Sequence, residues 1–296
     1  MQPTILAEQI HVGDRVTFGR EVVVGGPHGT PARSVSIGAG AVLQQRFEVR
    51  CDDGALRVGD RAFLGNDGRA LCGSLFVGDY TRLHNHIFIH GPGHIHVGHN
   101  CWVGGSCVLD GVGGILVGDN VGVGAHSQLW SHLQFGDILA GCRWHSKSPL
   151  VVEEDVWFVG HCIVSPIRAH RRSMALVGSV VTHDMAANHV YAGVPAKDVT
   201  DRLGPQFEDP PFEARLQRMR GYLDEFYAAH PRYRDRTLVP VAEYGDAEPA
   251  GLTQLHLMER TYTKRGTPEE QDFLAFVTPT LAKFVPRGWT CPSRSA

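Results

Sequence analysis

The sequence predicts a mainly β protein in which short parallel strands stack into a three-sided solenoid. Aliphatic residues followed by glycine, and often by an acid, recur at Val12-Gly13, Ile37-Gly38, Val58-Gly59, Val77-Gly78, Val97-Gly98 and Val117-Gly118. From each anchor, further apolar residues follow at intervals of six, as in Val97, Val103 and Leu109. Three hexads therefore make one coil, and an apolar spacing of six excludes a helix bundle, whose spacing is about 3.6.

A second observation concerns the fourth residue after each anchor, which is mostly small or β-branched. Such residues are Val16, Ala41, Ala62, Thr81, Cys101, Cys107, Val121, Ser127 and Cys162. A large residue alternating with a compact one suits flat faces that pack inward around a narrow prism, each coil about 4.8 Å above the last. The alternative, a glycine-rich β-sandwich, carries no fixed six-residue phase across many turns.

Composition favours a soluble globular protein with one long domain and a smaller second one. The chain has 296 residues, 35 glycines, 43% hydrophobic residues and a net charge of −3. A charge so close to zero indicates no nucleic-acid or anionic-membrane surface. The N-terminal residues lack the pattern of a signal peptide and no stretch approaches a membrane span, so a cytoplasmic protein is expected.

Cysteine and histidine raise the question of metal binding. The seven cysteines form no CxxC pair, and three of them occupy the compact inward position, where we expect core packing. Six histidines lie between His84 and His99, but their hexad phases spread them over different corners and outward faces. Only one column aligns, that of His86, Ser106, His126 and His161, and it places His126 close to His161 at one corner.

The period breaks once. Earlier coils start 19 to 25 residues apart, but Val117 and Val152 are 35 apart, which leaves an extended loop at about residues 131–150. A long loop leaving a rigid solenoid is where function is expected.

The strongest motifs follow this loop. They are VVEEDVW from Val151 to Trp157, LVGSVVTHDM from Leu176 to Met185, and VYAGVPAKDV from Val190 to Val199. They resemble motifs of the hexapeptide-repeat acyltransferases, a family that includes maltose and galactoside O-acetyltransferases. The resemblance implies a left-handed parallel β-helix over residues 1–204, acetyl-CoA as co-substrate without a required metal, and a homotrimer with a small-molecule acceptor, either a sugar or a glycoside.

The resemblance also assigns a general base. In LWSHLQFGD, His132 stands where the family's catalytic histidine enters the extended loop. Chemistry makes the same choice, because transfer of an acyl group to an alcohol requires a proton acceptor near neutral pH. Asp110 matches an acidic position near the acceptor, and Trp144 and His145, in the middle of the loop, are expected to contact the substrate.

Coenzyme A is expected on the later coils. The resemblance places the pantetheine arm and the nucleotide against Gly160, Val177, Gly178, Thr182, His183, Pro195 and Lys197. His183 replaces the lysine that is usual in the family.

Residues 205–296 depart from the repeat and predict a helical and mixed extension. Apolar residues at helical spacing predict an amphipathic helix within 210–230, and strands are expected within 237–264. Thr267-Pro268-Glu269-Glu270 is a capping box that starts a helix running to Phe276.

These patterns favour an acyl-CoA-dependent acyltransferase that acetylates a hydroxyl of a sugar or glycosylated metabolite. An N-acetyltransferase acting on an amino sugar, free or nucleotide-linked, remains open. A metal hydratase resembling the gamma-type carbonic anhydrases is a weaker alternative, because Pro166 stands where the second histidine of a His-x4-His pair would follow His161. The last alternative is a solenoid without catalytic activity. Neither the acceptor, the acyl chain length nor the role of the extension can be read from the residues.

Overall fold

The structure is a computed structural model that describes residues 2–244 and 251–294. It contains two compact units, one of Met1–Phe207 with Cys291–Ala296 and the other of Glu208–Thr290. The unit boundary lies close to the predicted one at residue 204, but the last described residues rejoin the first unit. There Cys291 and Ser293 are buried, and Arg168 Nη1 donates a hydrogen bond to the Ser293 carbonyl at 3.3 Å.

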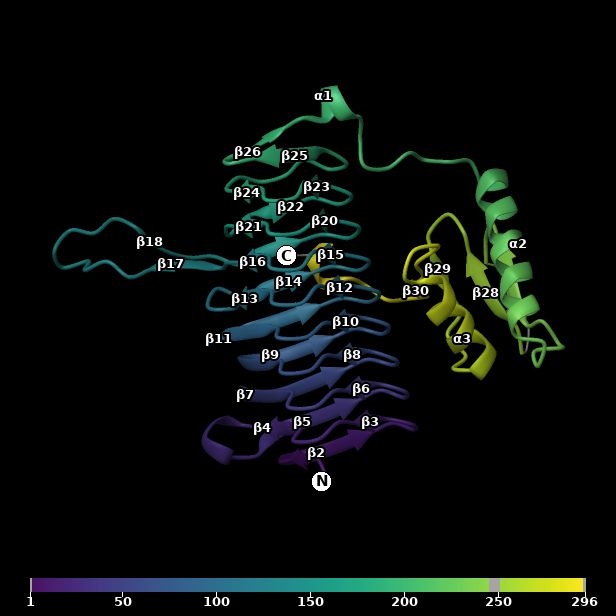
Figure 1. Ribbon diagram of the computed structural model, residues 1–296, viewed down its shortest axis with the longest axis horizontal. Coiled ribbons are helices and arrows are strands. Elements are labelled where there is room, and N and C mark those ends of the chain that lie inside the picture. The colour runs from purple at the N-terminus through teal and green to yellow at the C-terminus, as the bar shows by residue number, and fades with distance from the viewer. Residues whose placement is uncertain (1, 245–250, 295–296) are drawn as a thin grey trace. The chain divides into compact units, whose positions relative to one another are not determined.

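The first unit is a parallel β-helix with three faces, which confirms the predicted solenoid (Figure 1). Face 1 contains β1 (Thr4–Ile5), β4 (Val23–Gly25), the first parts of β7 (Glu48–Val58), β9 (Arg69–Val77) and β11 (Phe88–Val97), β13 (Val108–Asp110), β16 (Gln128–Leu129), β21 (Ile163–Val164) and β24 (Val180–Val181). Face 2 contains β2 (Ala7–Val12), β5 (Ala32–Ile37), the second parts of the three long strands, β14 (Ile115–Val117), β19 (Leu150–Val152) and β22 (Arg168–Ala169).

Face 3 is built from the shortest strands. It contains β3 (Thr17–Phe18), β6 (Val42–Leu43), β8 (Phe63–Leu64), β10 (Arg82–Leu83), β12 (Trp102–Val103), β15 (Gly122–Val123), β20 (Trp157–Phe158), β23 (Met174–Ala175), β25 (Val190–Gly193) and the antiparallel β26 (Ala196–Asp198). The short helix α1 (Thr200–Leu203) follows.

The core is a set of stacked columns that run along the solenoid. Ala70, Ile89, Leu109 and Leu129 are register partners on consecutive coils of face 1, and all are fully buried. The three cysteines predicted at compact inward positions, Cys101, Cys107 and Cys162, are likewise buried. Each coil therefore places the same hexad position above its predecessor, as the repeat predicts.

The corners on either side of face 3 need a left-handed backbone residue in almost every coil. Positive φ angles recur in one column at Arg15, Gly40, Arg61, Tyr80, Asn100, Asn120, Asp155, Arg172 and Asn188, and in the other at Glu21, Arg46, Asp67, His86, Ser106, His126, His161 and Gly178. A non-glycine residue in this region costs roughly 1–2 kcal/mol, which hydrogen bonds between coils offset.

The extended loop forms a projecting β-hairpin. It leaves face 1 after β16, and β17 (His132–Gln134) pairs with β18 (His145–Lys147) in antiparallel register. Because the next coil resumes with Val117 paired to Val152, the loop is inserted without disturbing the stack. Figure 1 shows the hairpin standing out from the side of the solenoid.

The second unit combines two helices with a small sheet. The sheet contains β27 (Leu238–Val241), β28 (Thr253–His256), β29 (Thr261–Tyr262) and β30 (Val285–Pro286), and the helices are α2 (Phe212–Ala229) and α3 (Pro268–Val277). Both helices lie where predicted, while residues 245–250 of the expected strand region fall outside the described residues. Of the helices in the described ranges, none has the length and apolar character needed to cross a membrane.

The predicted capping box is formed only in part. Thr267 Oγ1 accepts from the Glu270 amide at 3.2 Å, as expected. The Glu270 carboxylate, however, accepts from the amides of Arg265 and Gly266 and from the hydroxyl of Thr253. The side chain therefore secures the chain that enters α3 to the sheet, instead of bonding back to Thr267.

Two short 3-10 helices are η1 (Pro27–Gly29) and η2 (Pro292–Arg294). The first lies in the Gly/Pro-rich turn between β4 and β5.

Close stacking at the glycine of each anchor generates a prediction. A Cβ on Gly59 would lie 2.4 Å from the Asp79 amide nitrogen and 2.6 Å from the Gly78 carbonyl carbon. Because these are backbone atoms held by the next coil, Gly59→Ala is expected to lower the free energy of unfolding by about 1–3 kcal/mol in urea titrations. Gly105→Ala, which would meet only the Asn85 carbonyl oxygen at 3.2 Å, should cost clearly less. Equal losses would contradict the stacking argument.

Candidate active site

The root of the hairpin brings two coils into close contact. Asp110 ends β13, and its Oδ1 accepts a hydrogen bond from the Val112 amide at 3.0 Å, which shapes the turn that follows. Gly113 in this turn faces both ends of the hairpin, because a Cβ there would lie 2.3 Å from the Ser131 carbonyl oxygen and 2.5 Å from that of Ser148. Glycine is therefore required where the hairpin leaves and rejoins the solenoid.

Ser131 fastens this root from the hairpin side. Its buried hydroxyl donates to the Asp110 carbonyl at 2.5 Å and lies 3.3 Å from Asp110 Oδ1, and it accepts from the Gly113 amide at 2.8 Å. One hydroxyl thus holds the end of β13, its turn and the start of the hairpin together. The position of the next residue, His132, is fixed as a result.

His132 and Asp110 form a close pair. His132 Nδ1 lies 2.6 Å from Asp110 Oδ2, although the two groups are not in line for a straight hydrogen bond. The Asp110 side chain is fully buried, whereas 22% of the His132 side chain is exposed. The resemblance placed Asp110 against an acceptor, but burial places it beneath His132 instead. An imidazole with one nitrogen facing a buried carboxylate can use the other, Nε2, to exchange protons.

Aromatic residues surround this pair. The rings of Trp130 and His132 lie 6.5 Å apart, and the Trp130 indole donates to Gln128 Oε1 at 3.2 Å. His90 is the register partner of Asp110 one coil below, and its ring lies 6.5 Å from Trp130. The Asp110 carboxylate is thus covered between coils by side chains that face outward.

The hairpin presents a second histidine beside the first. Cross-strand register pairs His132 with Lys147 and Gln134 with His145, so the four side chains share one face of the hairpin. His145 and Trp144 are both exposed, and Trp144 is 77% accessible. Their predicted contact with the substrate stays a prediction.

The residues predicted for coenzyme A fall into three groups. Gly160, Val177 and Gly178 meet at the corner between faces 3 and 1, where the Gly178 amide donates to the Gly160 carbonyl at 2.9 Å. Thr182 and His183 follow β24 at the other edge of face 1, with Thr182 Oγ1 2.9 Å from His183 Nδ1. Pro195 and Lys197 belong to the β25–β26 hairpin at the end of the solenoid.

Between the first two groups, the last two coils of face 1 are apolar. Ile163 and Val180 are register partners on consecutive coils, and Ile163 is 41% exposed. Val177 is 66% exposed, and open space surrounds the position of a Cβ on Gly178. This part of the face can accommodate a slender chain that begins near the hairpin root.

The histidine-rich stretch does not converge on one point. His94 bonds with Ser74, His96 stacks on Phe76 with ring centroids 4.2 Å apart, and His99 Nδ1 accepts from the Asp79 amide. The predicted approach of His126 to His161 is confirmed, because their rings stack with centroids 4.9 Å apart. Within residues 2–244 and 251–294, no three His, Cys, Asp or Glu side chains are arranged to hold a metal ion.

Sequence reasoning missed two contributors to the site, Ser131 and Trp130. Both lie in the motif that drew attention to His132, between the end of β16 and His132. A serine directly before a candidate base and a tryptophan two residues before it are too common in sequences to identify site residues. Their roles depend on the turn after β13, which lies some twenty residues earlier in the chain.

Comparison with known proteins gives similarity of limited extent. No family model and no curated protein sequence matches this chain. Among solved structures, a hexapeptide-repeat-containing acetyltransferase from Vibrio cholerae is 21% identical, covers 45% of this chain and 74% of its own, and has a TM-score of 0.35. A maltose O-acetyltransferase from Clostridium difficile 630 is 23% identical over 52% of this chain and 70% of its own, with a TM-score of 0.35.

A third similar structure is an N-acyltransferase from Bacillus cereus, solved with dTDP-4-amino-4,6-dideoxyglucose and coenzyme A. It is 14% identical, covers 65% of this chain and 90% of its own, and has a TM-score of 0.39.

The stacked histidine His96 generates a pH prediction. Burial, and then the charge of nearby His99, lowers the pKa of His96 to about 4. Histidine in an unfolded chain has a pKa near 6.5, so between about pH 6.5 and pH 4 it is protonated in the unfolded chain but neutral in the folded one. The free energy of unfolding therefore falls as the pH drops through this range. Between pH 7 and pH 5, the free energy of unfolding measured in urea is expected to fall by about 2 kcal/mol less for His96→Gln than for the wild type. A variant with the full wild-type pH dependence would contradict the assignment.

Proposed function

We propose that this protein is an acyl-CoA-dependent acyltransferase, and that it acetylates a hydroxyl group of a sugar or a glycosylated metabolite. The observation that carries the proposal is the approach of His132 Nδ1 to the buried Asp110 Oδ2 at 2.6 Å, at the root of the projecting hairpin. A partly exposed imidazole fixed by a buried carboxylate is a common arrangement for a general base. Beside it, face 1 offers an apolar surface for a thioester arm.

In this reaction His132 removes the proton as the acceptor oxygen attacks. The acceptor hydroxyl gives its proton to Nε2 while its oxygen forms a bond to the thioester carbon. The tetrahedral intermediate collapses, the carbon–sulfur bond breaks, and the thiolate of coenzyme A receives the proton from the imidazolium. No oxidant, reductant or covalent enzyme intermediate is needed to balance this step.

Asp110 acts as a positioning residue in this scheme. Its carboxylate keeps Nδ1 of His132 turned inward, leaving Nε2 for the acceptor, and its negative charge stabilises the imidazolium that forms. Burial strengthens both effects, because charges interact more strongly when water is excluded. Ser131 and the Val112 amide hold the carboxylate in place.

The arm of coenzyme A is assigned to the apolar part of face 1 and its corner. Gly160, Val177 and Gly178 lie on one edge of this surface, and Thr182 and His183 lie on the other. The nucleotide end would then reach Pro195 and Lys197. His145 and Trp144, on the hairpin, remain candidates for contact with the acceptor.

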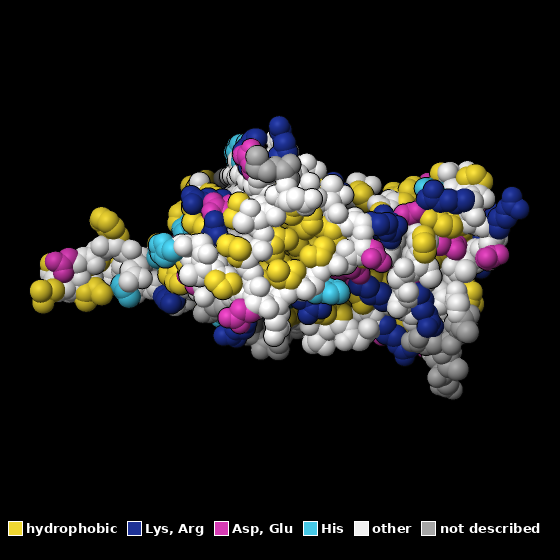
Figure 2. Space-filling model, turned by 90° about the horizontal axis from the view of Figure 1, so that it is seen from below, with side chains coloured by type: hydrophobic (Ala, Val, Ile, Leu, Met, Phe, Trp, Pro, Cys, Tyr) yellow, Lys and Arg dark blue, Asp and Glu magenta, His cyan; other side chains and the backbone are white. Residues whose placement is uncertain are grey.

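The hairpin also supports an oligomer, which we propose to be a homotrimer. Near its tip, Phe135 is 101% exposed and Leu139 is 99% exposed, and Trp144 is largely exposed as well. Figure 2 shows hydrophobic side chains on the projecting hairpin. Apolar side chains gathered on a projection are typical of a surface that another chain covers. A neighbouring solenoid would cover them and receive part of the site from the hairpin.

The enzymatic proposal is tested by release of free thiol from acetyl-CoA in the presence of a panel of sugars, amino sugars and glycosides. We expect His132→Ala to reduce kcat/KM by about 10²- to 10⁴-fold, because the general base is lost, while CoA binding is retained. His145→Ala is the matched control. It should keep general-base catalysis, because His132 is unchanged. Activity that survives in His132→Ala but not in His145→Ala would reassign the base.

Asp110→Asn separates positioning from folding. The substitution is expected to lower kcat by about a hundredfold through misplacement of the imidazole. The KM for acetyl-CoA should change little, because the buried carboxylate acts on the imidazole and not on the bound thioester. A purely structural role would instead alter kcat and KM together. Transfer only to amino groups would instead favour the N-acetyltransferase alternative.

The oligomer is tested by light scattering of the purified chain. We expect a mass three times the 32.4 kDa of one chain. Phe135→Ser combined with Leu139→Ser should shift this mass towards the monomer, since both side chains would lose their apolar cover. Met258→Ser, at an exposed apolar residue of the second unit, is the control and should leave the trimer intact. A monomeric wild-type protein would refute the proposal.

A further inference from the structure

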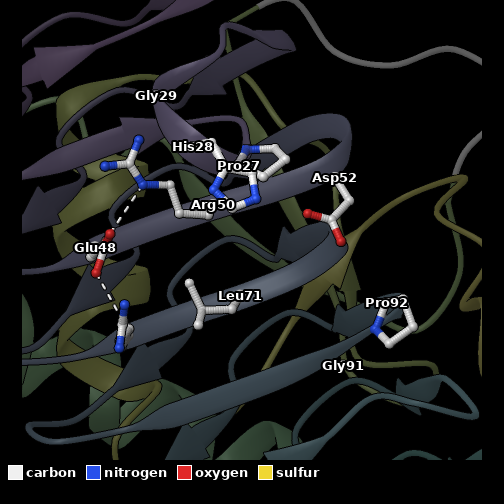
Figure 3. A pocket seen from close by; sticks show the side chains of 10 residues that line it. Pro27, His28, Gly29, Glu48, Arg50, Asp52, Leu71, Gly91 and Pro92 are labelled. Carbon is white, nitrogen blue, oxygen red and sulfur yellow. Dashed lines mark hydrogen bonds and ion pairs between the residues drawn. The ribbon is translucent and has the colours of Figure 1, made fainter.

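A hollow lined by charged and apolar residues lies on the early coils, away from the candidate active site (Figure 3). It has a volume of about 610 Å³ and is lined by residues from the η1 turn and from β7, β9 and β11. Glu48 lies between two arginines in it, with Arg50 Nε 3.0 Å from Oε1 and Arg69 Nε 2.9 Å from Oε2. Burial alone would raise the pKa of Glu48, but the hydrogen bonds and charges of Arg50 and Arg69 outweigh it and lower this pKa below its usual range.

The charges of this hollow balance. Arg50 and Arg69 oppose Glu48 and Asp52, and His28 adds charge only when it is protonated. Glu48 accepts a hydrogen bond from Arg69 through Nε, so the terminal nitrogens of Arg69 are the donors that a ligand can use. A hollow with many fixed donors and acceptors but no excess charge suits a ligand rich in hydroxyl groups better than a polyanion.

Aromatic rings continue from the hollow towards His132. Arg69 is the register partner of Phe88, and Leu71 is the register partner of His90, so the rings lie one coil above these two lining residues. They belong to β11, which also lines the hollow through Gly91 and Pro92. Phe88 is 39% exposed and stacks on His90 with centroids 4.9 Å apart. Trp130 and then His132 follow, each with its ring centroid 6.5 Å from the one before.

Together these side chains form a strip on face 1, made of Glu48, Arg50, Arg69, Phe88, His90 and Trp130. Glu48, Arg69, His90, Asp110 and Trp130 stand on five consecutive coils, each about 4.8 Å above the last, so the strip is about 19 Å long, roughly the length of four sugar rings. Aromatic faces pack against the apolar faces of such rings, while charged groups bond their hydroxyls.

We propose that this strip binds a neutral oligosaccharide whose end reaches His132, so that the acceptor is a glycan chain and not a single sugar. The inference rests on the proposed acyl transfer for the identity of the reacting end, but the binding itself does not. The arginine pair fixes the distant end of the chain, and Phe88 and His90 support the rings between.

The test uses the full chain and two neutral probes, maltose-series and chitin-series oligosaccharides of one to six units, with uronic-acid oligosaccharides of the same lengths for comparison. Binding is measured on a printed array, without acetyl-CoA, and acyl transfer is measured separately by thiol release. We expect affinity for one neutral series to rise by about tenfold or more between one and four units and then to level off.

Variants locate the gain on the strip. Phe88→Ala and, separately, Arg69→Gln should remove most of the gain with length, the first without altering any charge. Arg82→Gln is the matched control for Arg69→Gln. Arg82 is an exposed arginine on face 3 of the coil that carries Phe88, and its guanidinium lies over the Phe63 ring. The control variant should retain the full gain, and circular dichroism checks that all three variants fold.

Each outcome decides the matter. Length-dependent binding that the strip variants abolish supports the strip, and if no thiol is released under the same conditions, the proposed acyl transfer fails while the glycan site stands. Absence of binding to every neutral series, a gain with length that survives in both strip variants, or a gain confined to the uronic-acid series would overturn the proposal.

Discussion

The structure depends on the hydrogen-bonded register between consecutive coils. Each short strand bonds to the strands above and below it, so every hexad position stands over the same position of the previous coil. The glycines after the anchors allow this approach, since a Cβ on Gly59 or Gly98 would meet the next coil at about 2.4–2.5 Å. An insertion as long as that of residues 131–150 therefore leaves the stack, and the chain builds its site where this happens.

The hairpin is such an exit, and it determines the chemistry of its root. Because the coils on both sides keep their register, Gly113, Ser131 and Ser148 are forced together, and the strand end at Asp110 is brought under His132. A carboxylate in this buried position would be costly if it were left alone. The Val112 amide and the Ser131 hydroxyl bond to its Oδ1, and the imidazole lies 2.6 Å from its Oδ2.

Much of the first unit could be predicted from the sequence because its information is local and periodic. The anchors, the inward cysteines, the site of the insertion and the pairing of His126 with His161 all follow from counting hexads. The partner of His132 does not, because Asp110 reaches it only through a turn whose geometry depends on Gly113. In the second unit, Glu270 is another case: the capping motif predicts the start of α3, but the carboxylate bonds to chain outside the motif.

The same side chains serve the base and the surface beside it. His90 and Trp130 stand on the coils below and above Asp110, and together with the hairpin root they exclude water from its carboxylate, which is fully buried. Their outer surfaces continue the row of rings that begins at Phe88. A ligand that packs on this row would exclude water from the exposed part of His132, and so strengthen the interaction of its ring with the buried carboxylate. Occupation of the strip and the strength of the Asp110–His132 interaction are thus coupled without any movement of the solenoid.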